Sequence, residues 1–275
     1  MIYIITHKRF APYFTDELHY RVLHVGENGN TSEEYLSDSD GDSISNKNAH
    51  FCELTGLYWI WKNGAEKSAD VTGLVHYRRY FTTRLADFLY TYFGKKPKVL
   101  PYAVIEKQLK SHDVLLPIPE RIYRTVRQSY VDVHNEEDLV LTKCAIEEVC
   151  PDYVSDFERV MNSHQYYYAN MMICSKALLD AYAEWLFGVL SCLEKKIDIS
   201  KYAGDSYQER VFGFLSERLL QVWVLHNQLK IKQFPAFNTE SRRINAFEKN
   251  RSRIHNLWRK LKNKTKQSEA EDIDD

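Results

Sequence analysis

Short apolar runs alternate along the chain with longer stretches of helical periodicity. The apolar runs are nearly continuous, which is typical of strands in a sheet that is covered on both faces. They are residues 2–6, 21–26, 71–75, 113–116, 167–174 and 231–234. The helical stretches are residues 45–63, 102–110, 135–149, 152–161, 176–193 and 206–229. This alternation predicts an α/β fold, a single domain with a mainly parallel central sheet flanked by helices.

A polar segment over residues 27–45 is rich in Gly, Asn, Ser and Asp and is expected to form a loop. Loops of this length inside a compact domain are usually functional. Its alternating aspartates do not make an EF-hand, because Gly41 falls fourth and Ala49 twelfth in the calcium-loop pattern. A helix is expected to begin near Ser45, and its first N–H groups, with Ser45 or Asn48, are expected to face a ligand.

The composition is that of a soluble globular protein. Of the 275 residues, 44% are hydrophobic and 27% are charged, which excludes a mostly disordered chain. Tyr, Phe and Trp are abundant, at 19, 13 and 5 residues. Aromatic rings stack on the apolar faces of sugars, so this surplus fits a carbohydrate-handling protein, although an aromatic-rich core is the simpler explanation.

The cysteines and the N-terminus indicate a reducing compartment. The five cysteines form no C-x-x-C pair, so we expect reduced core thiols rather than disulfides or a zinc site. The first residues, Met1-Ile-Tyr-Ile-Ile5, lack the basic and apolar regions of a signal peptide and are expected to form a buried strand. Both observations predict a cytoplasmic protein.

Charge is balanced over the whole chain, at a formal −1, but not near its C-terminus. Residues 242–266 hold ten Lys or Arg and a single acid, whereas residues 268–275 are mainly acidic. Apolar side chains recur between the bases at helical spacing, at Ile244, Phe247, Ile254, Leu257, Trp258 and Leu261. We therefore expect a folded domain over residues 1–241, an amphipathic helix over 242–267 that contacts an anionic membrane surface, and a disordered tail. A helix packed on the domain and an arm that binds another polyanion are the alternatives, and we expect no nucleic-acid partner.

Basic side chains gather where two predicted strands end. The first strand ends at Thr6, His7 and Lys8, and the strand over residues 71–75 ends at His76, Tyr77, Arg78 and Arg79. Ligands of open α/β sheets bind beyond the carboxyl ends of the strands. Arginine suits phosphate because its planar fork makes paired, charge-assisted hydrogen bonds. We expect an anion site at this edge; the alternative is a core histidine beside arginines that pair with internal carboxylates.

Further polar residues interrupt apolar segments. Asn170 lies in the strand predicted over residues 167–174, where a sugar hydroxyl or the backbone would satisfy its amide. The helix over residues 206–229 offers acids and an arginine, Glu209, Arg210 and Glu217, with Asp205 just before it. A carboxylate there is a candidate general base, and internal ion pairs are the alternative. P-loop, G-x-G-x-x-G, G-x-S-x-G and H-E-x-x-H motifs are absent, and the histidines lack metal-ligand spacing, so we predict no metal ligands.

Several segments, taken in order, resemble one bacterial family. They are Ile4-Ile-Thr-His-Lys8, Asp40-Gly-Asp-Ser-Ile-Ser-Asn-Lys-Asn48, Cys52-Glu-Leu-Thr-Gly-Leu-Tyr-Trp-Ile-Trp-Lys-Asn63 and Gly73-Leu-Val-His-Tyr-Arg-Arg-Tyr-Phe81. Residues 170–173, 182–187 and 210–219 are similar to it as well. The family is that of the glycosyltransferases of capsular and exopolysaccharide gene clusters, formerly a domain of unknown function. The resemblance covers residues 2–235 and excludes the basic C-terminal segment.

The resemblance implies a GT-A-like fold and a hexose donor activated by a nucleotide, such as UDP-linked galactose or galactofuranose. The acceptor would be lipid-linked or an oligosaccharide, at the cytoplasmic face of the membrane, in surface polysaccharide synthesis. The donor would meet Thr6, His7, Lys8, Asp40, Ser45, Asn48, His76, Tyr77, Arg78 and Arg79. The acceptor side would include Asn170 and Met171, and catalysis would use Asp205, Glu209, Arg210 or Glu217.

One departure concerns the metal. Ordinary GT-A enzymes place Asp-x-Asp where this chain has His76-Tyr-Arg-Arg79. We expect Arg78 or Arg79 to neutralise the diphosphate, wholly or partly replacing Mn²⁺ or Mg²⁺. The rival interpretations are a non-catalytic module that binds a nucleotide sugar or carbohydrate in the same pathway, and a polyanion-binding protein that works through residues 242–266.

Overall fold

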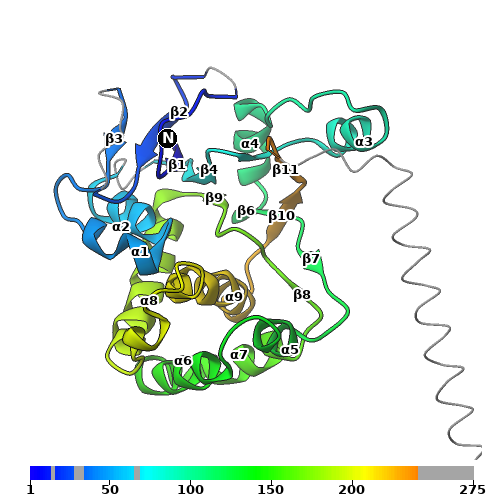
Figure 1. Cartoon of the computed structure of the whole chain (residues 1–275). Helices are drawn as coiled ribbons and strands as arrows, with labels where there is room; N and C mark the ends of the chain where they lie inside the picture. Colours follow the sequence, from blue (N-terminus) through cyan, green and yellow to red (C-terminus); the bar gives the residue numbers. More distant parts are fainter. Residues whose placement is uncertain (14–15, 28–33, 65–68, 241–275) are drawn as a thin grey trace, which may run out of the picture.

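A computed structural model of the chain is shown in Figure 1. The residues that it describes are 1–13, 16–27, 34–64 and 69–240. The basic helix and the acidic tail predicted for the C-terminus lie outside the described residues.

The core of the fold is a mixed, mainly parallel sheet with the strand order β10-β6-β9-β4-β1-β2-β3. The strands are β1 (Ile2–Thr6), β2 (Tyr20–His24), β3 (Leu36–Ser37), β4 (Thr72–His76), β6 (Val114–Pro117), β9 (Met172–Cys174) and β10 (Ile231–Phe234). Only β9 along this path is antiparallel to its neighbours, β4 and β6. The predicted α/β class with a mainly parallel sheet is confirmed.

Shorter strands add to this sheet. β5 (Arg79–Phe81) follows β4 and pairs with it in antiparallel register. β5 also pairs with β11 (Ala236–Asn238), again in antiparallel register. β7 (Glu120–Arg121) and β8 (Gln165–Tyr166) form a separate two-stranded sheet. The last described residues therefore return to the strand that carries Arg79.

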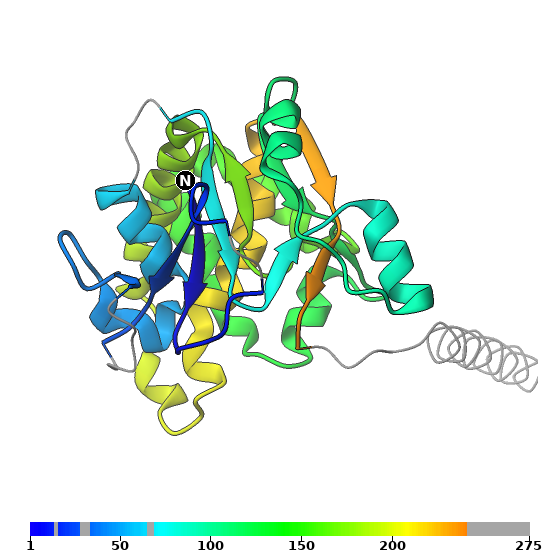
Figure 2. The ribbon, with the colours of Figure 1, turned by 90° about the horizontal axis from the view of Figure 1, so that it is seen from above.

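Helices lie on both sides of the sheet (Figures 1 and 2). They are α1 (Asn48–Phe51), α2 (Leu54–Asn63), α3 (Arg84–Phe93), α4 (Tyr102–Leu109), α5 (Val126–Val131), α6 (Glu136–Val149), α7 (Val154–Met161), α8 (Lys176–Glu194) and α9 (Val211–His226). Short 3-10 turns are η1 (Ser45–Lys47), η2 (Pro151–Tyr153), η3 (Ile199–Tyr202) and η4 (Gln208–Arg210).

Alternate residues of β1 enter two hydrophobic clusters. Tyr3 and Ile5 pack in a large cluster with side chains of α2, α6, α8 and α9. Ile2 and Ile4 pack in a second cluster, with α4 and β5. Both faces of β1 are thus covered, which explains why its sequence is apolar at every position instead of alternating. A Cβ on Gly56 would lie 2.9 Å from the Ile5 side chain, so this glycine lets α2 pack closely on the sheet.

The helix predicted over residues 45–63 is interrupted. Cys52 takes a left-handed φ of 52°, which separates η1 and α1 from α2. The helix predicted over residues 206–229 begins as η4 and becomes α-helical only at Val211. Helical periodicity continued through both breaks because the side chains on either side still face the same core.

The strand predicted over residues 167–174 is confined to its last part, β9. Ala169 and Asn170 take positive φ values of 77° and 39°, which bend the chain before β9 begins. The sequence prediction also missed α3 and α5, which span only ten and six residues.

All five cysteines lie in the described part of the chain and are free thiols, as predicted. Cys174 and Cys192 are buried, but Cys144 is exposed, so the expectation of core thiols is wrong for that residue. Among the described helices, none is both long and apolar enough to cross a membrane.

Candidate functional site

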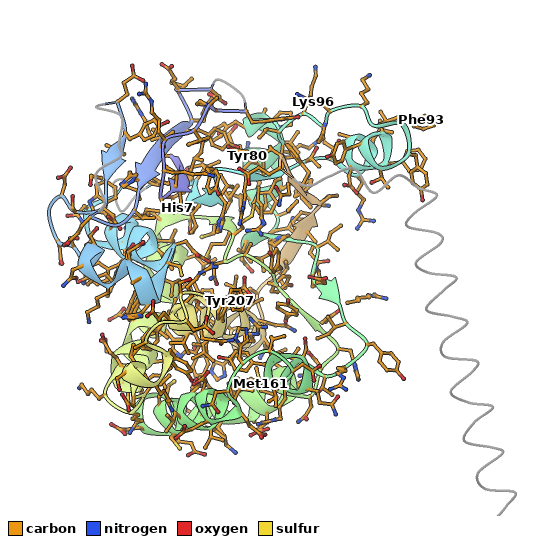
Figure 3. All side chains as sticks on the ribbon, viewed as in Figure 1. His7, Tyr80, Phe93, Lys96, Met161 and Tyr207 are labelled. Atoms are coloured by element: carbon orange, nitrogen blue, oxygen red, sulfur yellow. The ribbon has the colours of Figure 1, made fainter. Side chains whose placement is uncertain are left out.

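A cleft of about 1030 Å³ opens beyond the carboxyl ends of β1 and β4. This edge is where an open α/β sheet usually binds its ligand. The ends of the strands form one wall, and residues around α1, α5 and α9 form the others. His7 marks the strand wall and Tyr207 the helical wall (Figure 3).

Strand register brings the predicted strand-end residues together. β1 and β4 are parallel neighbours in which Ile5 pairs with His76, so Thr6 and His7 lie beside His76 and Tyr77. The Tyr77 N–H donates to Ile5 O at 3.0 Å, which continues the pairing past the end of β4. The His7 ring meets the Tyr77 ring edge-on, with 5.5 Å between centroids. One wall of the cleft is therefore built from two strand ends whose paired residues, Ile5 and His76, are 71 positions apart in the sequence.

Arg78 and Arg79 line the same wall with different partners. Arg78 Nη1 lies 3.1 Å from Glu240 Oε2, and both side chains are partly exposed. Arg79 donates from Nη2 to the Tyr168 hydroxyl at 2.5 Å, and its guanidinium lies over that ring. Among the described residues Arg79 forms no ion pair, so its charge is available to an anion in the cleft.

Glu217 is nearly buried at the centre of the cleft. Its Oε1 accepts from the Ala169 N–H at 2.8 Å, and its Oε2 lies 3.0 Å from Arg218 Nη1. Burial raises the pKa of Glu217 to about 7; Arg218 opposes this shift, and repulsion from Glu53 adds to it. A carboxyl group with this pKa exchanges its proton near neutral pH, as a general acid or base must.

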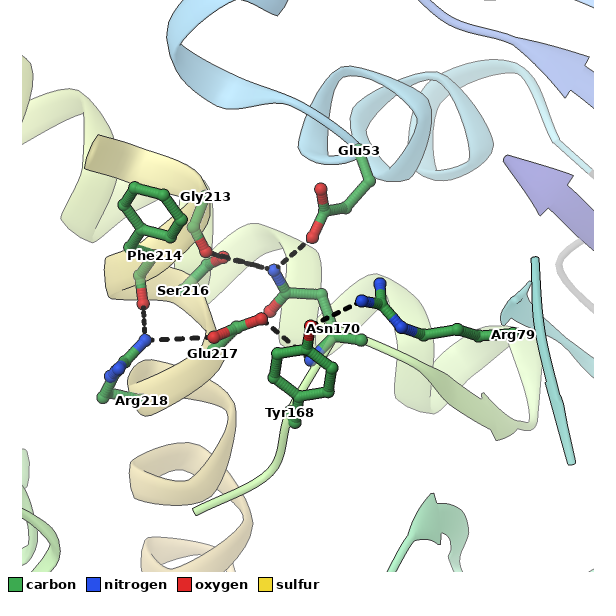
Figure 4. A network of polar contacts seen from close by, with 10 residues as sticks. Glu53, Arg79, Tyr168, Asn170, Gly213, Phe214, Ser216, Glu217 and Arg218 are labelled. Atoms are coloured by element: carbon green, nitrogen blue, oxygen red, sulfur yellow. Dashed lines mark hydrogen bonds and ion pairs between the residues drawn. The ribbon is translucent and has the colours of Figure 1, made fainter. Parts of the chain in front are cut away.

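Glu53 is a second carboxylate in the cleft, at the N-cap position of α2. Its Oε1 accepts from Asn170 Nδ2 at 2.7 Å (Figure 4). The same Asn170 nitrogen lies 2.7 Å from Ser216 Oγ and 3.3 Å from Gly213 O on α9. Asn170 thus ties the start of α2 to α9 and fixes Glu53 close to Glu217.

The backbone break at Cys52 faces the cleft as well. Its left-handed φ is unusual for a residue with a side chain, and such conformations gather at functional sites. Cys52 Sγ accepts from Arg210 Nε at 3.2 Å. Burial raises the pKa of Cys52 to about 11, so the thiol stays neutral at physiological pH. Cys52 therefore positions Arg210 without adding charge.

The histidines of the strand wall are held neutral. Burial lowers the pKa of His76, with attraction to Glu53 opposing the shift. His76 Nε2 lies 2.8 Å from Ala169 O, which only accepts, so Nε2 carries the ring proton. Burial, together with neighbouring cations, also lowers the pKa of His7. The positive charge of this wall therefore comes from its arginines.

The helical wall is aromatic. Tyr207 stacks on His134, and both pack against Phe214. Tyr207 and Tyr168 are exposed, at 51% and 43%, although both line the cleft. Exposed rings beside hydrogen-bonding groups suit the apolar faces of sugars.

Most of the sequence-predicted site residues line the cleft. They are Thr6, His7, Asn48, His76, Tyr77, Arg78, Arg79, Glu209, Arg210 and Glu217. The predicted residues that lie outside its lining are Lys8, Asp40, Ser45, Asn170, Met171 and Asp205. The reasons differ from residue to residue.

Ser45 and Asp40 make hydrogen bonds within the protein, at the loop before η1 and at the start of η1. Ser45 Oγ donates to the buried Asp38 Oδ1 at 2.5 Å, and the Asp40 carbonyl accepts from Trp59 Nε1 at 2.8 Å. Lys8 lies at the rim, with its Nζ 3.8 Å from Glu240 Oε1. None of these three residues lines the cleft, and the Ser45 hydroxyl is already held by Asp38.

Asn170 and Met171 lie behind the cleft surface. Asn170 is buried and its amide nitrogen is fully used by the protein, while Met171 belongs to the second hydrophobic cluster. This placement removes both from direct contact with an acceptor in the cleft. Asp205 accepts from the N–H groups of Tyr207 and Gln208, where it begins η4. It is a helix-terminus residue rather than a cleft base.

Sequence reasoning missed Glu53. The residue lies inside the Cys52–Asn63 motif, but its partner Asn170 is far away in sequence. The sequence did contain a signal for Glu53, namely a carboxylate beside the start of an otherwise apolar helix. An acidic residue at that position more often only caps the helix.

A protein-family model matches residues 1–228, most of the chain, and its description is "Domain of unknown function (DUF4422)". The chain belongs to the DUF4422 family. The structure is similar to that of the WbbM bifunctional glycosyltransferase in its apo form, with a TM-score of 0.73 and 25% sequence identity. The match covers 87% of this chain and 45% of WbbM, so the chain spans less than half the length of that protein. A search of curated proteins gives no match.

Side chains that commonly bind metals do not cluster in the described part of this DUF4422 chain. Within the described residues, no group of three or more His, Cys, Asp or Glu side chains is arranged to hold a metal ion. Glu53 and Glu217, the central carboxylates, already accept hydrogen bonds from the bend before β9.

Proposed function

We propose that this DUF4422 chain transfers a hexose from a nucleotide-sugar donor to a hydroxyl group of an acceptor. The observation that carries the proposal is the cleft itself, which is lined by arginines at the strand ends and by two carboxylates, Glu53 and the nearly buried Glu217. The likeness to the WbbM bifunctional glycosyltransferase supports the reaction class. UDP is the nucleotide that the sequence resemblance favours, and galactose or galactofuranose is the hexose.

Arg78 and Arg79 are proposed to hold the diphosphate. In the transfer, the bond between the anomeric carbon and the phosphate oxygen breaks, and its electron pair leaves with the nucleoside diphosphate. Two guanidinium groups stabilise the negative charge that develops there. Thr6, His7 and Asn48, on the adjoining part of the wall, would then meet the nucleoside.

Glu217 is proposed as the general base. As the acceptor oxygen bonds to the anomeric carbon, its hydroxyl proton must leave, and a carboxylate with a pKa near neutrality can take it. Glu209 also lines the cleft, and its Oε1 accepts from the Gly204 N–H at 3.3 Å. Glu217 has the perturbed pKa that a general base requires.

The aromatic helical wall is proposed to bind the acceptor, in place of Asn170 and Met171. Tyr207 on this wall, and Tyr168 beside Arg79, would present exposed rings to a sugar of a lipid-linked or oligosaccharide acceptor. Action at the cytoplasmic face of the membrane, in synthesis of bacterial surface polysaccharide, follows from the sequence resemblance. Contact of residues 242–266 with anionic lipid remains part of the same proposal.

The test is a coupled assay of nucleoside diphosphate release. The full chain is incubated with a panel of UDP-hexoses, with and without a lipid-linked saccharide, and with either chelator or added Mn²⁺. Acceptor-dependent UDP release that is lost in Glu217→Gln supports glycosyl transfer. Donor binding without turnover would instead identify a non-catalytic module. Activity that chelator abolishes and Mn²⁺ restores would contradict replacement of the metal by arginine.

A further inference from the structure

The helix α3 projects from the edge of the molecule, on the side opposite α1 and α2 (Figures 1 and 2). It begins with Thr83, whose side chain accepts from the Ala86 N–H, and ends at Gly94 in the left-handed conformation. None of its residues is buried, and it makes no extensive contact with another described helix or strand. Its ten residues are therefore a well-capped helix that contributes little to the core.

One face of this helix is apolar and exposed to solvent. Leu85, Phe88 and Tyr92 are spaced at i, i+3 and i+7 and so share a face. Their exposed fractions are 68%, 49% and 53%. The Phe88 and Tyr92 rings are in contact, with 4.6 Å between centroids. A contiguous exposed patch of this kind marks an interaction surface, because scattered apolar residues do not form such clusters.

Basic side chains border the patch. Lys95, Lys96 and Lys98 follow the helix directly and are exposed, and Arg84 begins it. Asp87 is the only acid between residues 82 and 100. Aromatic and aliphatic side chains flanked by lysines match the interface of an anionic membrane, where rings enter the headgroup region and lysines meet lipid phosphates.

The positive charge around the patch argues against two other partners, a second copy of this chain and its own C-terminal segment. A symmetric dimer through α3 would bring the lysines of both copies close together, because each copy presents the same surface. The segment over residues 242–266 is itself strongly basic, so its charge also repels the lysines. An anionic lipid surface complements the charge of the patch, whereas a second copy and the C-terminal segment do not.

We propose that α3, with Lys95, Lys96 and Lys98, docks this protein on anionic membrane surfaces. Leu85, Phe88 and Tyr92 enter the interface, and the three lysines contact the phosphates. The surface is separate from the cleft, since none of these residues lines it. The proposal does not depend on the reaction that the cleft performs.

Vesicle cosedimentation of the full chain tests the proposal. The vesicles are pure phosphatidylcholine, or equal parts of phosphatidylcholine and phosphatidylglycerol. The apolar variant is Leu85→Ser with Phe88→Ser, and the charge variant replaces Lys95, Lys96 and Lys98 by Gln. The matched control is Val140→Ser with Val149→Ser, since both valines are exposed on α6, far from α3 in Figure 1.

We expect the wild type and the control pair to bind the mixed vesicles equally. The apolar variant should bind at least about tenfold more weakly, because two large apolar side chains no longer enter the interface. Each lysine removed should weaken binding by about fivefold at low salt and by less at high salt. The wild type and all variants contain residues 242–266, so the ratio of variant binding to wild-type binding measures the contribution of α3 and its lysines alone.

Three results would overturn the proposal. The apolar variant could bind the mixed vesicles as tightly as the wild type, or the wild type could fail to bind them. The wild type could also sediment as a dimer that the apolar variant converts to a monomer, which would identify a second copy as the occupant. Unchanged thermal midpoints in all variants show that the fold is intact, as expected for exposed positions.

Discussion

Glu53 and Glu217 are held by consecutive residues of one bend. The Asn170 side chain donates to Glu53 at 2.7 Å, and the Ala169 N–H donates to Glu217 at 2.8 Å. Ala169 O also accepts from His76 at 2.8 Å. Because Ala169 and Asn170 both have positive φ values, the bend is an uncommon conformation that places two carboxylates and a histidine in one cleft. The relative positions of α2, α9 and the end of β4 therefore depend on Ala169 and Asn170.

The first prediction concerns the role of Glu217 in the rate. Glu217→Gln should lower the turnover number by about 10²–10⁴-fold, because the acceptor hydroxyl loses its general base. In the wild type, the rate should rise with pH through about 7, the pKa of Glu217, as the carboxyl group loses its proton. The rate-against-pH profile measures both effects. Glu184→Gln on the exposed side of α8 is the control, and an equal loss there would contradict the assignment.

The second prediction concerns stability. The pKa of Glu217 in the folded chain, about 7, lies above its ordinary value of 4.5, so between these two values the folded chain holds a proton that the unfolded chain has lost. The free energy of unfolding must therefore fall as pH rises through this window, by about 3 kcal/mol from this group. Glu217→Gln should flatten that part of the curve.

Chemical denaturation at several pH values measures the difference between wild type and variant. The exposed Glu184→Gln should keep the slope of the wild type. A Glu217→Gln curve parallel to that of the wild type would show that the Glu217 carboxyl titrates near its ordinary pKa.

The third prediction tests Arg79 as a diphosphate ligand. Arg79→Ala should weaken UDP binding by roughly 10- to 100-fold, because a charge-assisted pair contributes about 1.5–3 kcal/mol. Arg79→Lys should recover only part of this, since an ammonium cannot form the planar, paired contact. Calorimetric titration with UDP gives the dissociation constants. Arg159→Ala, exposed on α7, should leave them unchanged, and a similar loss at both sites would indicate nonspecific charge effects.

The fourth prediction concerns Glu240, whose carboxylate lies 3.1 Å from Arg78 and 3.8 Å from Lys8. A diphosphate at Arg78 must compete with this carboxylate. Glu240→Gln should therefore tighten UDP binding by about two- to fivefold, as expected for an exposed ion pair. Glu148→Gln breaks a comparable exposed pair with Lys196, at 2.6 Å, and serves as the control. Weaker UDP binding in Glu240→Gln would show that Glu240 supports the site instead of competing for it.

Some features of the site follow from local sequence. Continuous apolar runs located β1 and β4, and the parallel arrangement of these strands fixed which ends meet, so His76, Arg78 and Arg79 could be placed at one edge beforehand. Arg210, at the end of η4, and Glu217, on α9, are seven residues apart, which is about two helical turns, and both line the cleft. Such predictions succeed because strand ends and helix faces are set by short-range geometry.

Other features depended on contacts between distant segments. The break at Cys52 and the bend at Ala169 and Asn170 conflict with the propensities of these residues, and they persist because α9 and the start of α2 hold them. The apolar pattern did not reveal them, since a kinked segment still turns its apolar residues to the core. For the same reason Asn170 was expected to face a ligand, whereas the fold uses it internally.

The sequence by itself determined the α/β class, the longer strands of the sheet and the arginines at its edge, because these depend on periodicity and on the order of elements along the chain. Only the tertiary structure decided that Glu53 joins Glu217, that burial and the nearby Glu53 raise the pKa of Glu217, and that α3 stands apart from the core. Burial and repulsion between charges act through space, so their effects appear only when residues far apart in sequence are brought together.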